Sequence, residues 1–324
     1  RFEEDALRLM RAVRFAAQLG FEIELQTKSA IQSKSNLLKM IAHERIRDEL
    51  IKLVESDNPE RGIVLMQELG LLKIVLPELE EGVGVAQNKH HIYNVFEHSV
   101  KSLGFAAKYN FNVYVRFASL FHDVGKPRAK AGAGPEASFH GHEFVGAKMT
   151  ARALERLKFP KDFIEKVYTL VRYHMFYYNV GEVTAKSVRR LVRKAGPENM
   201  TELLELRQAE RKGSGVPKAE PYKLRHLKYM IEKVSRDPLT VGMLKVNGND
   251  VMQTLGVEPG PKVGYILNAL LEEVIDEPEH NSRERLLNRM KELNQLPLSE
   301  LVKLAESGKE KLGEEKEKED EGIK

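Results

Sequence analysis

The chain has 324 residues, of which 42% are hydrophobic and 31% are charged, a composition typical of a globular protein with about two domains. It has no cysteine, which excludes disulfides and thiolate metal sites. No apolar run approaches the roughly 18 residues that a membrane-spanning helix needs, so we expect a cytoplasmic protein with no membrane partner. Because the first residue is Arg and not Met, we also expect the chain to be a piece of a longer protein.

The net charge of +4 is unevenly distributed along the chain. Residues 309–324 hold five lysines against seven acidic residues in a low-complexity run, which predicts a disordered charged tail. Residues 186–236 hold fourteen lysines and arginines against six acidic residues. An excess of that size fits a surface that faces a polyanion such as an RNA backbone. A solvated helix face rich in charge would show the same composition.

Helical periodicity begins at the first residues and continues through the chain. Leu7, Met10, Val13 and Ala17 recur at helical spacing, and Gly20 ends the pattern. Further helical patterns cover residues 27–54 and 59–72, and we find no alternating strand pattern. The predicted fold class is therefore all-α. Asp5 and Arg8 are three residues apart and share a helix face, where an ordinary surface ion pair is the simplest interpretation.

Seven of the ten histidines lie between residues 90 and 174, and His122 is followed directly by Asp123. His122 and Asp123 end an apolar run, VRFASLF, in the stretch FHDVGKP. His98 lies in the helical pattern NVFEHSVKSL, His142 in the run HGHE, and His174 at the end of VYTLVRYH. Neutral imidazoles and carboxylates suit Mn, Fe, Ni, Zn or Mg ions, so this grouping predicts a divalent metal site.

Not every residue near this stretch is predicted to be a ligand. His90 and His91 fit a helix cap or a loop surface, and the role of His140 stays open. Lys126 follows the His122–Asp123 pair closely enough to neutralise a substrate phosphate, although a lysine at a helix end is unremarkable in itself.

Several runs of sequence resemble a known superfamily: NVFEHS, FHDVGKP, FHGHEFVGAKMTARAL, VRYHMFYY and LRQAERKGSG. They are similar to the HD superfamily of metal-dependent phosphohydrolases and, more narrowly, to the HD domain of bacterial tRNA nucleotidyltransferases and poly(A) polymerases. The resemblance implies one ion held by His98, His122, Asp123 and a distal carboxylate, with water completing the shell. A second ion bridged by Asp123 would draw on His142 and His174.

The distal carboxylate is the point at which this sequence departs from the family pattern. Relatives show Asp in the corresponding LRxAD run, whereas this chain has Glu210. Glutamate ligates metal with a longer side chain, so the substitution changes the geometry expected at the centre.

The first residues carry a second resemblance. The runs EEDALR and LMRAVRFAAQLGF are similar to the neck helix of tRNA nucleotidyltransferases. The resemblance implies that Asp5 and Arg8 read the Watson–Crick edges of incoming CTP or ATP. The chemistry fits, because a carboxylate accepts from an exocyclic amine and a guanidinium donates to ring acceptors.

These observations together predict four parts: a nucleotide-binding and RNA-binding helical neck over residues 1–81, an HD domain over 82–215, a helical body over 216–308 and the tail 309–324. We expect the RNA-binding portion of a tRNA nucleotidyltransferase or poly(A) polymerase without its catalytic head, acting at the 3′ end of tRNA or another RNA. The HD site would be a phosphohydrolase with one or two ions of Mn, Ni, Fe or Mg. The alternatives are a stand-alone HD nucleotide phosphohydrolase and an RNA-binding scaffold with an inactive HD site.

Overall fold

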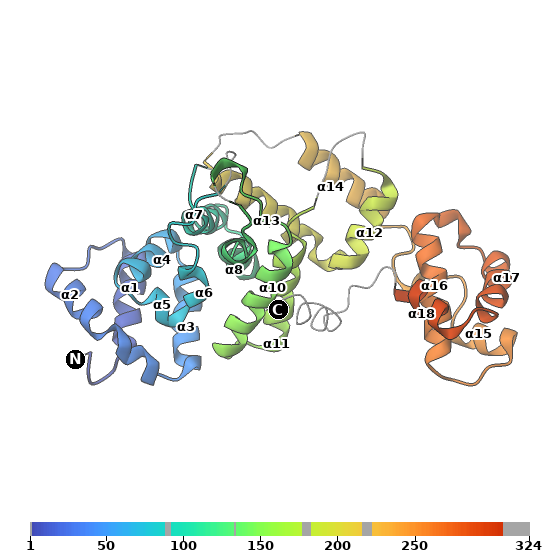
Figure 1. Cartoon of the computed structure of the whole chain (residues 1–324), viewed down its shortest axis with the longest axis horizontal. Coiled ribbons are helices and arrows are strands. Elements are labelled where there is room, and N and C mark those ends of the chain that lie inside the picture. The colour runs from blue at the N-terminus through green and yellow to red at the C-terminus, as the bar shows by residue number, and fades with distance from the viewer. Residues whose placement is uncertain (1, 88–91, 133, 177–182, 216–221, 307–324) are drawn as a thin grey trace. The chain divides into compact units, whose positions relative to one another are not determined.

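The computed structural model describes residues 2–87, 92–132, 134–176, 183–215 and 222–306, and these ranges are built from helices (Figure 1). The β-type pairing found within them is an isolated antiparallel bridge between Ala131 and Ser138. The predicted all-α fold class is therefore confirmed. None of the helices in the described ranges combines the length and the apolar character required to cross a bilayer.

The chain divides into two compact units that interleave in sequence. Unit 1 comprises Arg1–Phe176 and Thr201–Pro221, and unit 2 comprises Tyr177–Met200 and Tyr222–Lys324. The chain therefore leaves unit 1, returns to it for one helix and leaves again. The predicted domain boundaries at residues 81, 215 and 308 stay predictions, and the tail 309–324 lies outside the described residues.

The first helices of unit 1 form a small bundle that contains the predicted neck. Helix α1 starts at Leu7, buries Leu7, Met10 and Val13, and ends where Gly20 takes the left-handed conformation at φ 71°. Glu49 of α3 is buried and accepts hydrogen bonds from Arg11 and Arg14 of α1, so a charged pair fixes these two helices together. The helices of this bundle are α1 (Leu7–Leu19), α2 (Leu25–Lys34), α3 (His43–Val54), α4 (Pro59–Glu68), α5 (Leu72–Val75) and α6 (Pro77–Glu80).

The rest of unit 1 surrounds the histidine-rich stretch. Its helices are α7 (Val95–Lys108), α8 (Val113–Phe121), α9 (Lys126–Ala129), α10 (His142–Arg156), α11 (Lys161–Tyr173) and α13 (Met200–Gly213). Phe117 of α8 is fully buried and packs edge-on against Phe159 and Phe163, at centroid distances of 5.3 Å. This aromatic cluster anchors α8 against α11 and so fixes the end of α8, from which the site begins.

Unit 2 has its own apolar core, centred on the long helix α16. Leu270, Val274 and Ile275 of that helix are buried against residues such as Leu286, Met290 and Leu301. The helices of unit 2 are α12 (Ala185–Ala195), α14 (Tyr222–Val234), α15 (Gly248–Leu255), α16 (Pro261–Asp276), α17 (Arg283–Asn294) and α18 (Leu298–Glu306).

The basic segment 186–236 is divided by the structure into paired and unpaired portions. On α12, Lys186 and Arg190 form ion pairs with Asp276 at 2.7 Å and 2.9 Å, and Arg193 pairs with Glu272. Arg189 donates to the backbone carbonyls of Ile275 and Asp276, at the end of α16. Much of the α12 charge therefore fastens α12 to α16.

Candidate metal centre

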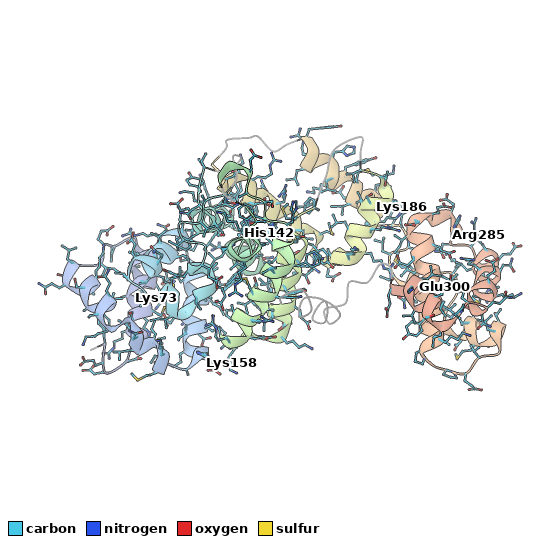
Figure 2. All side chains as sticks on the ribbon, viewed as in Figure 1. Lys73, His142, Lys158, Lys186, Arg285 and Glu300 are labelled. Atoms are coloured by element: carbon cyan, nitrogen blue, oxygen red, sulfur yellow. The ribbon has the colours of Figure 1, made fainter. Side chains whose placement is uncertain are left out.

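Helix ends place four histidines of unit 1 around one carboxylate. Asn94 caps α7 by accepting from the Glu97 amide, and Glu97 accepts in return from the Asn94 amide, which fixes the turn that carries His98. His122 and Asp123 follow the last residue of α8, as the sequence pattern predicts. His142 begins α10 and His174 follows α11. Figure 2 labels His142 among the densely packed side chains of this region.

A close contact between two glycines brings His142 to Asp123. A Cβ atom on Gly125 would lie 2.5 Å from the backbone nitrogen of Gly146 and would also collide with the carbonyl oxygen of His142. Backbone cannot move aside as a side-chain tip can, so residue 125 has to be glycine for α10 to approach this turn. Gly125 does not end α8, which stops at Phe121, and its φ of −78° is not left-handed. The close approach of the α10 backbone is its reason for being glycine.

The side chains form two groups of potential ligands that share Asp123. One group is His98, His122 and Asp123, and the other is Asp123, His142 and His174, with the ligand atoms of each group within 4.8 Å of one another. The two carboxylate oxygens face opposite groups. Oδ2 lies 3.5 Å and 3.2 Å from Nε2 of His98 and His122, whereas Oδ1 lies 3.3 Å and 3.8 Å from Nε2 of His142 and His174. Asp123 therefore has the position of a bridging carboxylate.

Hydrogen bonds to the backbone assign the protons on three of the imidazoles. Nδ1 of His122 donates to the Ser119 carbonyl at 2.8 Å, and Nδ1 of His142 and of His174 donate to carbonyls at 2.8 Å and 2.6 Å. A carbonyl oxygen can only accept, so each Nδ1 carries the hydrogen and each neutral ring presents a lone pair on Nε2.

Lone pairs consequently converge without a proton between them. Nε2 of His142 and Nε2 of His174 lie 3.3 Å apart, and both face the same oxygen of Asp123. Burial lowers the pKa of His174 to about 3 and, despite the nearby Asp123, that of His98 to about 4, so protonation is a poor way to relieve this arrangement. A divalent cation fits it, and the nitrogen-rich donor set favours a transition metal over Mg.

The electrostatic environment of Asp123 also fits a metal site. Burial alone would raise the pKa of Asp123, but His122 and Lys126 hold it well below its ordinary value. Burial likewise opposes protonation of His122, and Asp123 outweighs it and raises the pKa of that imidazole. The carboxylate therefore stays ionised, as a metal ligand must.

Lys126 completes the polar contacts of the centre. Its Nζ is buried and donates to Oδ2 of Asp123 and to Oε1 of Gln87, both at 2.7 Å. Gln87 in turn donates to the Tyr93 carbonyl at 3.1 Å. Sequence reasoning missed Gln87, because it lies in a loop segment without periodicity and outside the motif. The role of Lys126 in neutralising a substrate phosphate stays a prediction.

Glu210 lies near the two groups but belongs to neither of them. Arg207 donates to both of its carboxylate oxygens, at 2.7 Å and 2.6 Å. Burial raises the pKa of Glu210, yet Arg207, His122 and His174 outweigh that effect and lower it to about 2. The predicted ligand role of Glu210 therefore stays a prediction, and Arg207 is a partner that the sequence motif did not reveal.

A third glycine brings α13 against α7. A Cβ atom on Gly213 would lie 2.7 Å from the backbone nitrogen of Ser102, whose hydroxyl donates to the His98 carbonyl at 2.8 Å. This close packing places the turn with Glu210 beside the helix that carries His98. His90 and His91, which are not predicted as ligands, lie outside the described residues.

The predicted nucleotide-reading pair lies in the same unit, at the start of α1. Asp5 accepts from the Leu7 amide at 3.1 Å and from Arg45 of α3 at 3.2 Å. These bonds outweigh partial burial and lower the pKa of Asp5, so it is ionised. Arg8 donates to Glu4 at 2.8 Å. Asp5 thus lies just before α1 and Arg8 in its first turn, each with a different ion-pair partner, while their role in nucleotide binding stays a prediction.

Comparison with known proteins gives this geometry a family context. Residues 20–82 match the family model "Probable RNA and SrmB- binding site of polymerase A", and residues 145–290 match "tRNA nucleotidyltransferase domain 2 putative". Both matches lie within the portions predicted as neck, HD domain and body. Neither family description names an HD domain, so the HD assignment stays a prediction that the His/Asp groups support.

Individual relatives agree with the family models. An A-adding tRNA nucleotidyltransferase of Deinococcus radiodurans is 38% identical over 83% of this chain and 64% of its own length. A CC-adding tRNA nucleotidyltransferase of Thermus thermophilus is 34% identical over 83% of this chain and 62% of its own length. A multifunctional CCA protein of Neisseria gonorrhoeae is 29% identical over 60% of this chain and 48% of its own length.

The chain spans less than two thirds of the length of these curated relatives. What it shares with them includes the regions that the two family models describe. The chain is therefore similar to tRNA nucleotidyltransferases, and it matches the models of two regions, an RNA-binding site and domain 2.

Proposed function

We propose that this chain is the tRNA-binding and nucleotide-selecting portion of a tRNA nucleotidyltransferase, and that its HD-type centre is a divalent metal-dependent phosphohydrolase. The similarity to A-adding and CC-adding enzymes supports the first part. The single observation that carries the second part is the convergence of imidazole lone pairs on the two oxygens of Asp123.

The nucleotide-selecting role rests on how α3 supports α1. Arg45 and Arg11 hold the carboxylate of Asp5, and Glu49 holds Arg11 and Arg14 from the other side of the same helix pair. A carboxylate fixed in this way presents one oriented acceptor for the exocyclic amine of cytosine or adenine. Arg8 would donate to the ring acceptors of the same base.

The hydrolytic role rests on the residues around Asp123. His98, His122, His142 and His174 would hold the metal, which when bound lowers the pKa of a water molecule so that it can attack phosphorus. Asp123 orients the two ligand groups, and Lys126 supplies a fixed positive charge beside them. That charge would neutralise a phosphate oxygen. Phosphomonoesters and 2′,3′-cyclic phosphates are the proposed substrates.

The first experiment measures metal content and hydrolysis in the same preparations. The purified chain is loaded with Mn, Ni or Mg and assayed on 2′,3′-cyclic AMP and on a generic phosphate ester. We expect bound metal and turnover, and loss of both in His122→Ala. His43→Ala is the matched control, because His43 starts α3 away from the centre and should leave both unchanged. Turnover that survives in His122→Ala would contradict the proposal.

A second candidate is an RNA-binding portion whose metal centre holds helices together without catalysis. Its support is burial: His98, His122 and His174 are 0% exposed, and Asp123 is 2% exposed. The tie between Glu210 and Arg207 also occupies the predicted distal ligand. This candidate predicts bound metal and a higher melting temperature without turnover, and tRNA binding that weakens with salt.

A further inference from the structure

Helix α14 carries a row of aromatic rings on its exposed side. Tyr222 and Tyr229 are 61% and 58% exposed. The ring of His226 lies between them, with centroid distances of 5.8 Å to Tyr222 and 6.2 Å to Tyr229. The spacing of four and then three residues places the three rings on one face. Leu227 and Val234 are buried on the opposite face, so the row lies on the side of α14 away from its buried residues.

Two cations follow the rings along the chain, Lys233 in the last turn of α14 and Arg236 two residues beyond its end. Lys233 and Arg236 are exposed, and neither has an ion-pair partner within the part of the chain that the structure describes. On α12, by contrast, Lys186, labelled in Figure 2, and Arg190 pair with Asp276. Unpaired charge of the basic segment is therefore found beside the rings, where the sequence of α14 contains a single acid.

The combination of rings and cations identifies the chemistry of the partner. An apolar peptide would use the rings but not the charge, and a duplex backbone would use the charge but not the rings. Unpaired RNA uses both, because every base has a π face and every link a negative phosphate. Exposed tyrosines are suited to stacking, since a ring has few torsions to immobilise.

We propose that the surface formed by Tyr222, His226, Tyr229 and Lys233 of α14, together with Arg236 two residues beyond the helix end, is a stacking platform for unpaired bases of RNA. The rings stack on the bases, and the two cations contact the flanking phosphates. The proposal rests on the RNA-binding function proposed above and adds to it the site and the single-stranded character of the RNA that the site takes.

The test of stacking uses the full chain and a short RNA that carries 2-aminopurine at unpaired positions next to a duplex stem. Stacking quenches the fluorescence of this base. We expect Tyr222→Leu/Tyr229→Leu to bind about 30-fold more weakly and to lose the quenching, since each stacked base contributes about 1–3 kcal/mol. Tyr222→Phe/Tyr229→Phe keeps the rings and should stay within about twofold of the parent chain.

The test of the cations measures the salt dependence of the same binding. Lys233→Gln/Arg236→Gln should reduce the slope of log affinity against log salt by about 1.4, because each single-strand phosphate contact contributes about 0.7. Lys186→Gln/Arg190→Gln removes the same charge from residues already paired with Asp276, and should leave the slope unchanged.

Three outcomes would overturn the platform. It fails if the Leu variant binds the RNA and quenches its fluorescence like the parent chain. It also fails if that variant loses as much affinity for fully paired RNA as for the RNA with unpaired bases. It fails as well if the control Tyr109→Leu, an exposed tyrosine of unit 1, causes an equal loss. In these cases the parent chain still binds RNA and the proposed function stands. Absence of RNA binding by the parent chain would remove the proposed function, and the platform with it.

Discussion

At the scale of single residues, the centre is defined by which atom of each side chain is already occupied. Three histidines are held through Nδ1 by backbone carbonyls three residues earlier, which turns their Nε2 atoms toward Asp123. Lys126 competes with any bound cation for one oxygen of the same carboxylate. In the proposed function, the motif FHDVGKP would supply a ligand pair together with a charge that opposes metal binding and assists phosphate binding.

This dual position of Lys126 leads to a prediction for Lys126→Met. Without the ammonium, a divalent ion no longer shares Asp123 Oδ2 with a cation, so Mn should bind about tenfold more tightly. Hydrolysis of phosphate esters should fall by about 100-fold, because the charge that neutralises phosphate is gone. Calorimetric Mn titration and the hydrolysis assay measure the two effects.

This prediction is specific because Mn affinity should rise while the hydrolysis rate falls. Lys126→Arg retains the charge and should keep the weaker Mn binding of the parent chain. A variant Lys126→Met that loses Mn affinity and activity together would show that Lys126 only supports the local fold.

At the scale of elements, sequence periodicity located the helices better than the contacts between them. The end of α8 at Phe121 and the end of α1 before Gly20 follow from apolar spacing and from glycine. The pairing of α12 with Asp276 could not be predicted, because that acid lies 86 residues beyond Arg190 in the chain. Arg207 and Glu210 are three residues apart on one helix, so their spacing could have predicted this ion pair. The resemblance to the family implied a role only for the acid.

Close contacts at glycines also cannot be predicted from the sequence, because a motif shows the glycine but not the backbone that packs against it. We predict that Gly125→Ala costs about 3 kcal/mol of unfolding free energy, since the added Cβ collides with the α10 backbone. The variant should also lose metal, because His142 begins α10. Urea denaturation and metal content after purification measure these effects.

Gly264→Ala is the matched control. Gly264 lies in α16, and a Cβ atom there would have no other atom within 4 Å, so alanine should stabilise the chain by about 0.5–1 kcal/mol. A stable, metal-loaded Gly125→Ala would show that α10 can shift without harm to the centre.

At the scale of the whole molecule, all five clustered ligands belong to unit 1. Metal should therefore stabilise unit 1 and leave unit 2 unchanged. At a free Mn concentration 100 times the dissociation constant, the gain is about 2.7 kcal/mol if the metal binds only the folded state. Hydrogen exchange should report slower exchange in α7, α8, α10 and α11, and unchanged exchange in α15 and α17. Asp123→Asn should abolish the effect, and equal slowing in both units would contradict it.

The return of the chain to unit 1 for α13 has a consequence for the order of events during synthesis. The helix with Glu210 and Gly213 emerges from the ribosome only after α12, which belongs to the other unit. Until then Ser102 has no α13 backbone against it and the neighbourhood of His98 stays open. A nascent chain released at residue 176 would hold all five clustered ligands yet lack this closing layer, so the centre matures late in translation, and premature termination yields an unfinished one.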